Sequence, residues 1–378
     1  MKVCFCYHAF YPTKGGVEEV IMQISKVLVK QGDEVTVVTA ECPGHPIREK
    51  IEGINVIRIK PLFNLMKVPI VPDIGKALSE IDMDILHVHG SIPGFSDNSV
   101  LWAKKHNIPC VLTYHFDGNA DHLIGNMVAY VYNRTINNLA VSKADIVTAT
   151  SDSYAQTSPV LKHYIDKVKV IPNGVHLEKF TDVSDEQVSS VKKKYDLEGK
   201  KIVLFLGRIV GYKGLDYLVR AMDHIDDATL IIAGPGGLNS SAGTVRESDA
   251  RDRIRHIGRV SDDDLAGLFT ASSVYCLPSI SRGENFGITL LEAMVCGIPC
   301  VYTDIPGKDH MDSTYSLRAI PKDAKDLADK INTLLKDKSM RKEMGENAKI
   351  AVEKYCWSNI VPEYLDIYAG LMKTSRKN

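Results

Sequence analysis

Short apolar runs alternate with longer amphipathic stretches along almost the whole chain, and the two kinds of run predict different elements. The short runs predict buried strands. In the first half these lie near residues 3–7, 34–39, 84–88, 109–113, 145–148 and 168–171. Between the first two strands, one face of a predicted helix that ends before Gly32 carries Val17, Val20, Ile21, Ile24 and Leu28. Strands that alternate with helices are typical of a parallel sheet.

A second series of the same kind begins at Ile202. Its predicted strands are 202–206, 229–233, a short one near 256, 274–278 and 299–303, and helices are expected from about 215 and 287. The repetition predicts an α/β protein with two doubly wound, Rossmann-like domains that face each other across a cleft. We place the domains at 1–172 and 201–355, the polar and unpatterned stretch 173–200 as a junction, and a terminal helix at 356–378.

Length and composition narrow the class of protein. A chain of 378 residues is longer than one hydrophobic core usually serves, which favours two domains. A net charge of -1 argues against a nucleic-acid-binding protein. The eight cysteines form no CxxC pair and several lie in apolar runs, as in a reduced cytoplasmic protein. Because the sequence has neither a signal peptide nor an apolar run long enough to span a bilayer, we expect a cytoplasmic protein.

The segment SRGENFGITLLEAMVCGIPCV at 281–301 carries the strongest signal for chemistry. A turn that contains glycine separates Glu284 from a helix that is expected to begin near Gly287 and to hold Glu292. The free amides of such a helix start favour an anion, especially phosphate. A carboxylate on the loop can accept hydrogen bonds from sugar hydroxyl groups, and one on the helix can reach a ribose.

Two basic residues follow the first strand of the second half, in FLGRIVGYKGLD. Arg208 lies at the carboxyl end of that strand, and Lys213 lies at the start of the next helix. Two cations at one turn repel each other unless they share an anion, and a diphosphate can be that anion. The spacing is not that of a Walker A loop, so the pattern does not indicate a phosphoryl-transfer ATPase.

In the first half, Gly15 and Gly16 follow the first strand and open a helix, so their amides can approach a phosphate or a sugar. His115 comes just after a strand, where an open parallel sheet places functional side chains. We expect His115 to face the ligand cleft. His87 lies within its strand and is expected to be structural.

Taken together, these residues resemble the retaining glycosyltransferases of family 4, which have the GT-B fold. The matching segments are GGVEE at 15–19, HVHG at 87–90, TYHF at 113–116, IPNGV at 171–175, GRIVGYKG at 207–214, ENFGITLLEAMVCGIPCV at 284–301 and a terminal helix with a tryptophan. The Glu-x7-Glu spacing of Glu284 and Glu292 belongs to this pattern. TDIPGKDH at 303–310 lacks the usual Gly-Gly-x-x-Glu segment, so no residue is assigned there.

The resemblance implies a UDP- or GDP-linked sugar donor bound by the second domain and a sugar, lipid or other hydroxyl acceptor approached by the first. The last helix would pack back on the first domain. Arg208 and Lys213 would hold the diphosphate, Glu292 the ribose and Glu284 the hydroxyls of the donor sugar. The implied donor-binding residues are Gly16, Arg208, Lys213, Glu284, Asn285, Phe286, Gly287, Ile288 and Glu292, and the implied catalytic residues are His115, Glu284, Arg208 and Lys213.

The expected reaction is front-face transfer of a hexosyl group with retention at the anomeric carbon. The leaving diphosphate oxygen would help to deprotonate the incoming hydroxyl, while fixed positive groups stabilise its charge. A nucleotide-sugar epimerase and a non-catalytic nucleotide-sugar-binding protein remain alternatives.

No divalent metal or other cofactor is expected, because Arg208, Lys213 and a helix start take the position of the ion. The three aspartates at 262–264 follow Ser261 and predict a capped helix start rather than a metal site. The stretch KPLFNLMKVPIVP at 60–72 mixes apolar residues with lysines. It is a candidate for peripheral membrane contact, with a loop packed on the first domain as the alternative.

Overall fold

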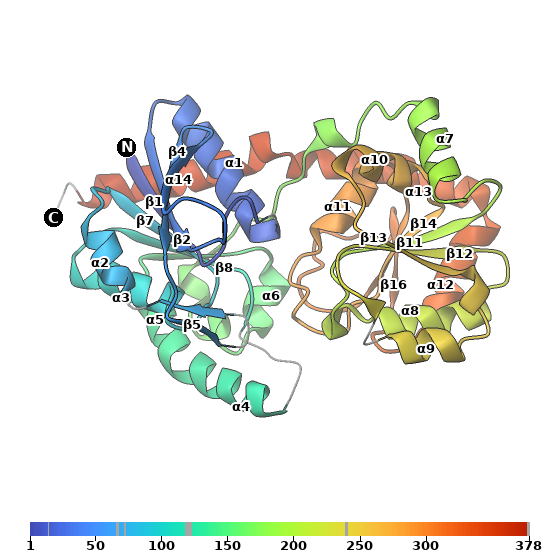
Figure 1. Cartoon of the computed structure of the whole chain (residues 1–378), viewed down its shortest axis with the longest axis horizontal. Helices are drawn as coiled ribbons and strands as arrows, with labels where there is room; N and C mark the ends of the chain where they lie inside the picture. Colours follow the sequence, from blue (N-terminus) through green and yellow to red (C-terminus); the bar gives the residue numbers. More distant parts are fainter. Residues whose placement is uncertain (14, 66–67, 72, 118–122, 239–240, 376–378) are drawn as a thin grey trace. The chain divides into compact units, whose positions relative to one another are not determined.

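The structure, a computed structural model, describes residues 1–13, 15–65, 68–71, 73–117, 123–238 and 241–375. The chain divides into two compact units: unit 1 comprises Met1–Asn173 and Trp357–Asn378, and unit 2 comprises Gly174–Cys356. Each unit is built on a largely parallel sheet packed between helices (Figure 1). The predicted class, α/β with two Rossmann-like halves, is therefore confirmed.

The main sheet of unit 1 has the strand order β10-β9-β8-β7-β1-β2-β4-β3. The strands are β1 (Lys2–Cys6), β2 (Glu34–Ala40), β3 (Arg48–Ile51), β4 (Ile54–Ile59), β7 (Ile85–His89), β8 (Cys110–Tyr114), β9 (Ile146–Ala149) and β10 (Val168–Val170). Neighbours pair in parallel, apart from β3, which runs antiparallel to β4. A separate hairpin pairs β5 (Phe63–Leu65) with β6 (Val68–Ile70). The chain order reverses between β1 and β7, the place where open sheets bind ligands.

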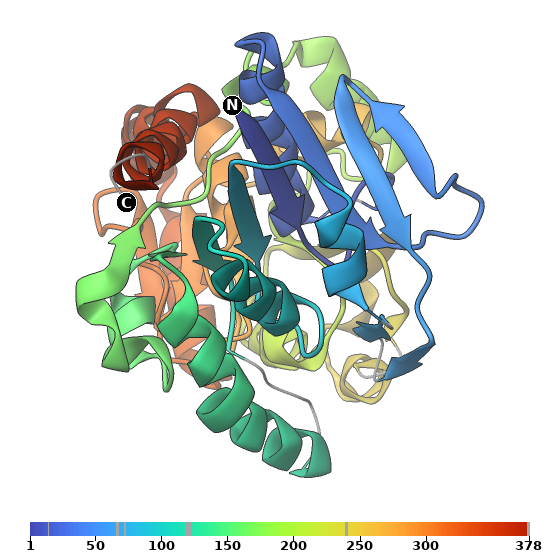
Figure 2. The same ribbon diagram turned by 90° about the vertical axis from the view of Figure 1, so that its left-hand side faces the viewer.

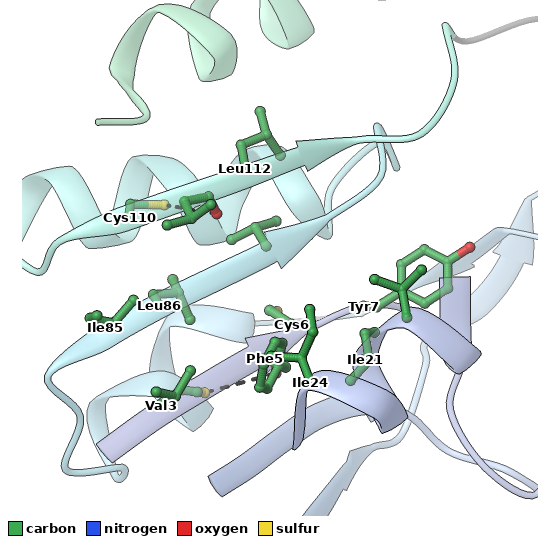
Figure 3. Packing of buried hydrophobic residues seen from close by; sticks show 14 of the residues in the cluster. Val3, Phe5, Cys6, Tyr7, Ile21, Ile24, Ile85, Leu86, Cys110 and Leu112 are labelled. Carbon is green, nitrogen blue, oxygen red and sulfur yellow. Dashed lines mark hydrogen bonds between the residues drawn. The ribbon is translucent and has the colours of Figure 1, made fainter. Parts of the chain in front are cut away.

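The helices of unit 1 cover this sheet. They are α1 (Gly16–Lys30), α2 (Ile74–Ser79), α3 (Ser96–Lys105), α4 (Leu123–Tyr132), α5 (Asn138–Lys143), α6 (Asp152–Thr157) and α14 (Trp357–Ser375). Figure 3 shows Ile21 and Ile24 of α1 beside Phe5 of β1, all of them buried, as the helical periodicity predicts. The terminal helix α14 belongs to unit 1, where it contacts α1.

The sheet of unit 2 has the order β13-β12-β11-β14-β15-β16, and its neighbours pair in parallel. The strands are β11 (Ile202–Leu206), β12 (Thr229–Ala233), β13 (Ile254–Gly258), β14 (Val274–Leu277), β15 (Cys300–Thr303) and β16 (Ser316–Ala319). Its central strands are buried and read as continuous apolar runs because helices cover both faces. Here the chain order reverses between β11 and β14.

The helices of unit 2 are α7 (Asp185–Lys194), α8 (Leu215–Ala221), α9 (Ala242–Glu247), α10 (Asp262–Ala271), α11 (Ile288–Val295), α12 (Ala324–Lys336) and α13 (Lys338–Val352). The prediction of an unpatterned junction at 173–200 was wrong. That stretch contains α7, which begins with a capping box at Ser184 and packs on α10. Buried apolar side chains spaced along the stretch anchor it to the core of unit 2: Val175, Phe180, Val191 and Leu197.

Two surface features bear on the sequence expectations. The side chain of Ser261 accepts a hydrogen bond from the amide of Asp264 and caps α10, as the pattern predicts. In the stretch 60–72, Leu62 and Phe63 are exposed, while residues 66, 67 and 72 lie outside the described part of the chain. Among the described helices, none is both long enough and apolar enough to cross a membrane.

Candidate functional site

Two loops of unit 2 leave the carboxyl ends of β11 and β14, the strands between which the chain order reverses. The loop after β11 carries Lys213, and the loop after β14 carries Glu284. They are in direct contact, because the amide of Ile280 donates a 2.8 Å hydrogen bond to the carbonyl oxygen of Tyr212. The fold thus brings together two motifs that lie far apart in the sequence, at the edge of the sheet where ligands bind.

Lys213 and Glu284 form an ion pair, and each side chain is only about one-tenth exposed. The hydroxyl of Ser279 donates to the same carboxylate oxygen, Oε2, at 3.3 Å. Burial by itself would raise the pKa of Glu284, but the nearby ammonium groups and hydrogen bonds outweigh it and hold that pKa below its ordinary value. Glu284 is therefore a buried, ionised acceptor, and among its described contacts none is made by Oε1.

Glycines shape the turn that carries Lys213. Gly214 has φ of +68°, and a Cβ there would lie 2.0 Å from the carbonyl oxygen of Pro278, so the two loops meet only because residue 214 has no side chain. A Cβ on Gly207 would lie 3.4 Å from Nζ of Lys213, whose side chain thus lies over the backbone of Gly207. Arg208, by contrast, is exposed and makes no hydrogen bond or ion pair among the described residues. Its guanidinium is available to a ligand.

Helix α11 begins directly after the Glu284 loop. Gly287 is its N-cap residue and has φ of +86°, a conformation that a glycine adopts without strain. The first two amides of α11, those of Ile288 and Thr289, lack partners within the helix and form its positive end, whereas the amide of Leu290 donates to the carbonyl oxygen of Gly287 at 2.8 Å. Phe286 is buried beneath this start, and Glu292, just over one turn along, is half-buried.

The structure adds a residue that the sequence analysis did not assign. Lys308 is 7% exposed, and its Nζ donates to the carbonyl oxygens of Glu284 (2.9 Å) and Asn285 (3.4 Å). Burial lowers the pKa of Lys308 to about 8. It lies in the loop after β15, next to β14 in the sheet, so its place at the carboxyl edge of a parallel strand was the signal that could have found it.

The remaining predicted residues belong to unit 1. His115 follows β8, is buried, and has its Nε2 3.0 Å from Nδ1 of His89. Burial lowers the pKa of His115 to about 3, so its ring is neutral. His87 is fully buried and bonds through its ring nitrogens to the hydroxyls of Tyr368 (2.6 Å) and Thr113 (2.7 Å), a structural arrangement. Gly16 is exposed at the start of α1.

The structure therefore brings together Lys213, Glu284 and residues 285–288 in unit 2, with Arg208 on the same loop as Lys213. Gly16 and His115 form part of a second set, at the corresponding edge of the sheet in unit 1.

Two protein families match this chain. Residues 14–179 match Glycosyltransferase Family 4, and residues 188–351 match Glycosyl transferases group 1, so the two together span most of the sequence. O-antigen chain mannosyltransferase C of Escherichia coli is 28% identical, over 99% of this chain and 100% of the relative. N-acetyl-alpha-D-glucosaminyl L-malate synthase of Bacillus anthracis is 27% identical, over 97% of each chain.

Solved structures share the whole architecture. Sucrose-phosphate synthase from Thermosynechococcus elongatus has a TM-score of 0.83 at 21% identity and covers 99% of both chains. The Anabaena protein HepE in complex with UDP-glucose has a TM-score of 0.77 at 19% identity, over 98% of this chain and all of the other. At such identities these similarities establish the fold. Together with the family matches, they show that the chain belongs to the glycosyltransferases of the GT-B type and is similar to family 4.

Proposed function

We propose that this glycosyltransferase is a retaining hexosyltransferase that uses a UDP- or GDP-sugar as its donor. The observation that carries the proposal is the buried Lys213–Glu284 pair at the point of unit 2 where the chain order reverses, directly before the N-terminus of α11. A cation, a carboxylate and free helix amides at one place suit a ligand that has both a phosphate and sugar hydroxyls.

Each group has a role in binding the donor. Arg208, Lys213 and the first amides of α11 bind the diphosphate, since all three are positive and Arg208 is free of other partners. Glu284 accepts a hydrogen bond from a sugar hydroxyl through Oε1, because Oε2 is already engaged by Lys213 and Ser279. Glu292 accepts from the ribose. Asn285 and Phe286 contribute backbone of the segment that connects these two glutamates.

In the reaction, the bond between the anomeric carbon and the diphosphate oxygen breaks, and the acceptor oxygen bonds to that carbon on the same face. The departing oxygen takes the proton of the acceptor hydroxyl. Arg208, Lys213 and the α11 amides stabilise the charge that develops on it. Because Glu284 is ion-paired and hydrogen-bonded at Oε2, we favour a role as acceptor of a hydrogen bond over one as covalent nucleophile.

The roles of Gly16 and His115 rest on the family resemblance. A neutral His115, with its Nε2 held by His89, can exchange a hydrogen bond with a sugar hydroxyl without repelling a positive charge at the anomeric carbon. Gly16 would let the start of α1 approach the donor phosphates.

We propose that the acceptor is associated with a membrane and that unit 1 binds the surface of that membrane peripherally. Helix α4 and the helical segments that follow it expose several large apolar side chains: Met127, Val128, Tyr130, Val131, Ile136 and Leu139. Figure 2 shows α4 projecting from the sheet of unit 1. Exposed apolar surface of this kind suits a lipid interface, as do Leu62 and Phe63.

Sedimentation with anionic liposomes tests the membrane contact. The parent protein should sediment with the liposomes, and the double variant Val128→Asp/Val131→Asp should stay in solution. If the parent remains in solution at low salt, membrane contact is excluded.

A donor panel tests the function itself. The two relatives carry different sugars in their names, mannosyl and N-acetylglucosaminyl, so the panel should include UDP- and GDP-linked forms of several sugars. A transferase releases UDP or GDP slowly from one donor and faster once a suitable acceptor is added. An epimerase would change the sugar without net release of nucleotide, and a binding protein would do neither. The family matches favour the transferase over both alternatives.

A further inference from the structure

The segment from Asp304 to His310 packs along the Glu284 loop. A Cβ on Gly307, which has φ of +97°, would lie 1.6 Å from the carbonyl oxygen of Asn285, so the two backbones touch. The ring of His310 stacks on Phe286 with centroids 4.1 Å apart. Lys308, between them, donates to the carbonyls of the same loop. One segment therefore holds the loop at three successive residues.

The charge of Lys308 is not explained by packing. A methionine would fill a similar volume without the cost of burying an ammonium group. In place of a contact ion pair, Lys308 makes hydrogen bonds to two neutral carbonyl groups. The charged groups that face it are Glu284 and Asp309, which favour its charged form, and Lys213, which opposes it. The adjacent His310 is kept neutral by burial, because its pKa lies well below the ordinary value.

In the proposed reaction, two anionic groups compete for Lys213: the carboxylate of Glu284 and the diphosphate of the donor. Without ligand it pairs with Glu284, whereas the bound donor would attract it with a diphosphate. If Lys213 turned to the diphosphate and nothing replaced it, Glu284 would be a buried carboxylate without a cation, which favours its protonated form. A protonated Glu284 would be a weaker acceptor for a sugar hydroxyl.

We propose that Lys308 is a positioning residue for donor-sugar binding: it fixes the Glu284 loop through two carbonyl groups and keeps Glu284 ionised when Lys213 engages the diphosphate. The inference rests on the proposed function. Its consequence is that the proton on Lys308 is needed for donor use, so kcat/KM for the donor should fall as the pH rises through about 8, while below that value Lys308 stays charged.

The test compares Lys308→Met, which removes the charge, with Lys308→Arg, which keeps it. For Lys308→Met we expect kcat/KM for the nucleotide sugar to fall at least about tenfold, as for the loss of a charged contact, with binding of free UDP or GDP changed by less than about twofold. Lys308→Arg should recover much of the transfer and show no loss of activity near pH 8, because a guanidinium stays protonated there. Lys325→Met, an exposed position on α12, is the matched control and should behave like the parent.

Several outcomes would overturn the inference. These are an unchanged kcat/KM in Lys308→Met, equal losses for nucleotide and nucleotide sugar, or an alkaline limb near pH 8 that persists in Lys308→Arg. If Lys308→Met fails to fold, the pH profile of Lys308→Arg decides by itself. If the parent protein uses no donor in the panel, the proposed function is refuted. If the parent transfers sugar and Lys308→Met transfers it equally well, only the role of Lys308 is refuted.

Discussion

Lys213 and Glu284 form a buried ion pair that joins the loop after β11 to the loop after β14. The pair links two motifs of the sequence and holds them at the edge of the sheet before any ligand arrives. Such pairs contribute little to stability as a whole, but the loss of one partner leaves the other charge buried and alone.

The pair should therefore show strong coupling in unfolding experiments. Lys213→Met and Glu284→Gln should each lower the free energy of unfolding by about 2–4 kcal/mol, and the double variant should lose less than the two losses added together. Glu284→Gln should cost more than Lys213→Met, because it leaves two cations facing each other, whereas Lys308 still faces the carboxylate when Lys213 is absent. Urea titrations of the four proteins measure the coupling. Additive losses would mean that the two side chains do not interact in solution.

The two members of the pair should differ in the ligand they recognise. Lys213→Ala should weaken binding of the nucleoside diphosphate by about 1.5–3 kcal/mol more than binding of the nucleoside, since one charged hydrogen bond is lost. Glu284→Ala should impair transfer more than it impairs binding of the nucleoside diphosphate, because its partner is the sugar. Calorimetry with nucleoside, nucleoside diphosphate and nucleotide sugar separates the two cases. If Lys213→Ala weakened binding of the nucleoside and of the nucleoside diphosphate equally, Lys213 would have no specific role in binding the diphosphate.

Buried histidines should make unit 1 sensitive to acid. Burial lowers the pKa of His87 and of His115 to about 3 and that of His8 to about 4, from an ordinary value of 6.5. Below pH 6.5 the unfolded chain binds protons that the folded chain does not. The contribution of these histidines to the free energy of unfolding is therefore fully present above pH 6.5 and is lost as the pH decreases toward 3. His115→Gln should reduce this dependence, by at most about 1.4 kcal/mol per pH unit. Urea titrations at pH 7, 6 and 5 give the slopes, and an unchanged slope in the variant would contradict the assignment.

Transfer should not need a divalent metal, because Arg208, Lys213 and the start of α11 supply the positive charge at the diphosphate. Activity should survive EDTA, and added Mg²⁺ or Mn²⁺ should change it only modestly. If EDTA abolished transfer and either ion restored it, the anion site proposed here would be incomplete.

The sequence predicted the strands that are buried on both faces, because continuous apolar runs such as IVLFL and TLIIA are typical of parallel strands that helices cover on both sides. It missed β4, the second strand from the edge of the sheet, whose buried and half-buried residues alternate, and α7, which is polar apart from Val188 and Val191. α7 packs on α10, which is far from it in the chain, and β4 pairs with β2 as well as with the adjacent β3. A local pattern does not report such contacts.

The site shows the same division. The sequence assigned Glu284, Lys213 and the start of α11 to the candidate site because glycines and charges follow strands at regular places. The ion pair between them was not foreseen, because a loop sequence does not tell which side chain lies over Gly207. Lys308 was missed because its segment departs from the family pattern, and only the neighbouring position of β14 and β15 places it under the Glu284 loop.

The most direct test of the central claim is the anomeric configuration of the product. With an α-linked UDP- or GDP-sugar that the donor panel identifies, the proton NMR spectrum of the purified product should show an α-glycosidic bond, formed with release of one nucleoside diphosphate per bond. Glu284→Ala should slow the appearance of this signal. A β-linked product would contradict retention, and the absence of any glycosidic product from every donor and acceptor in the panel would contradict the account of this site.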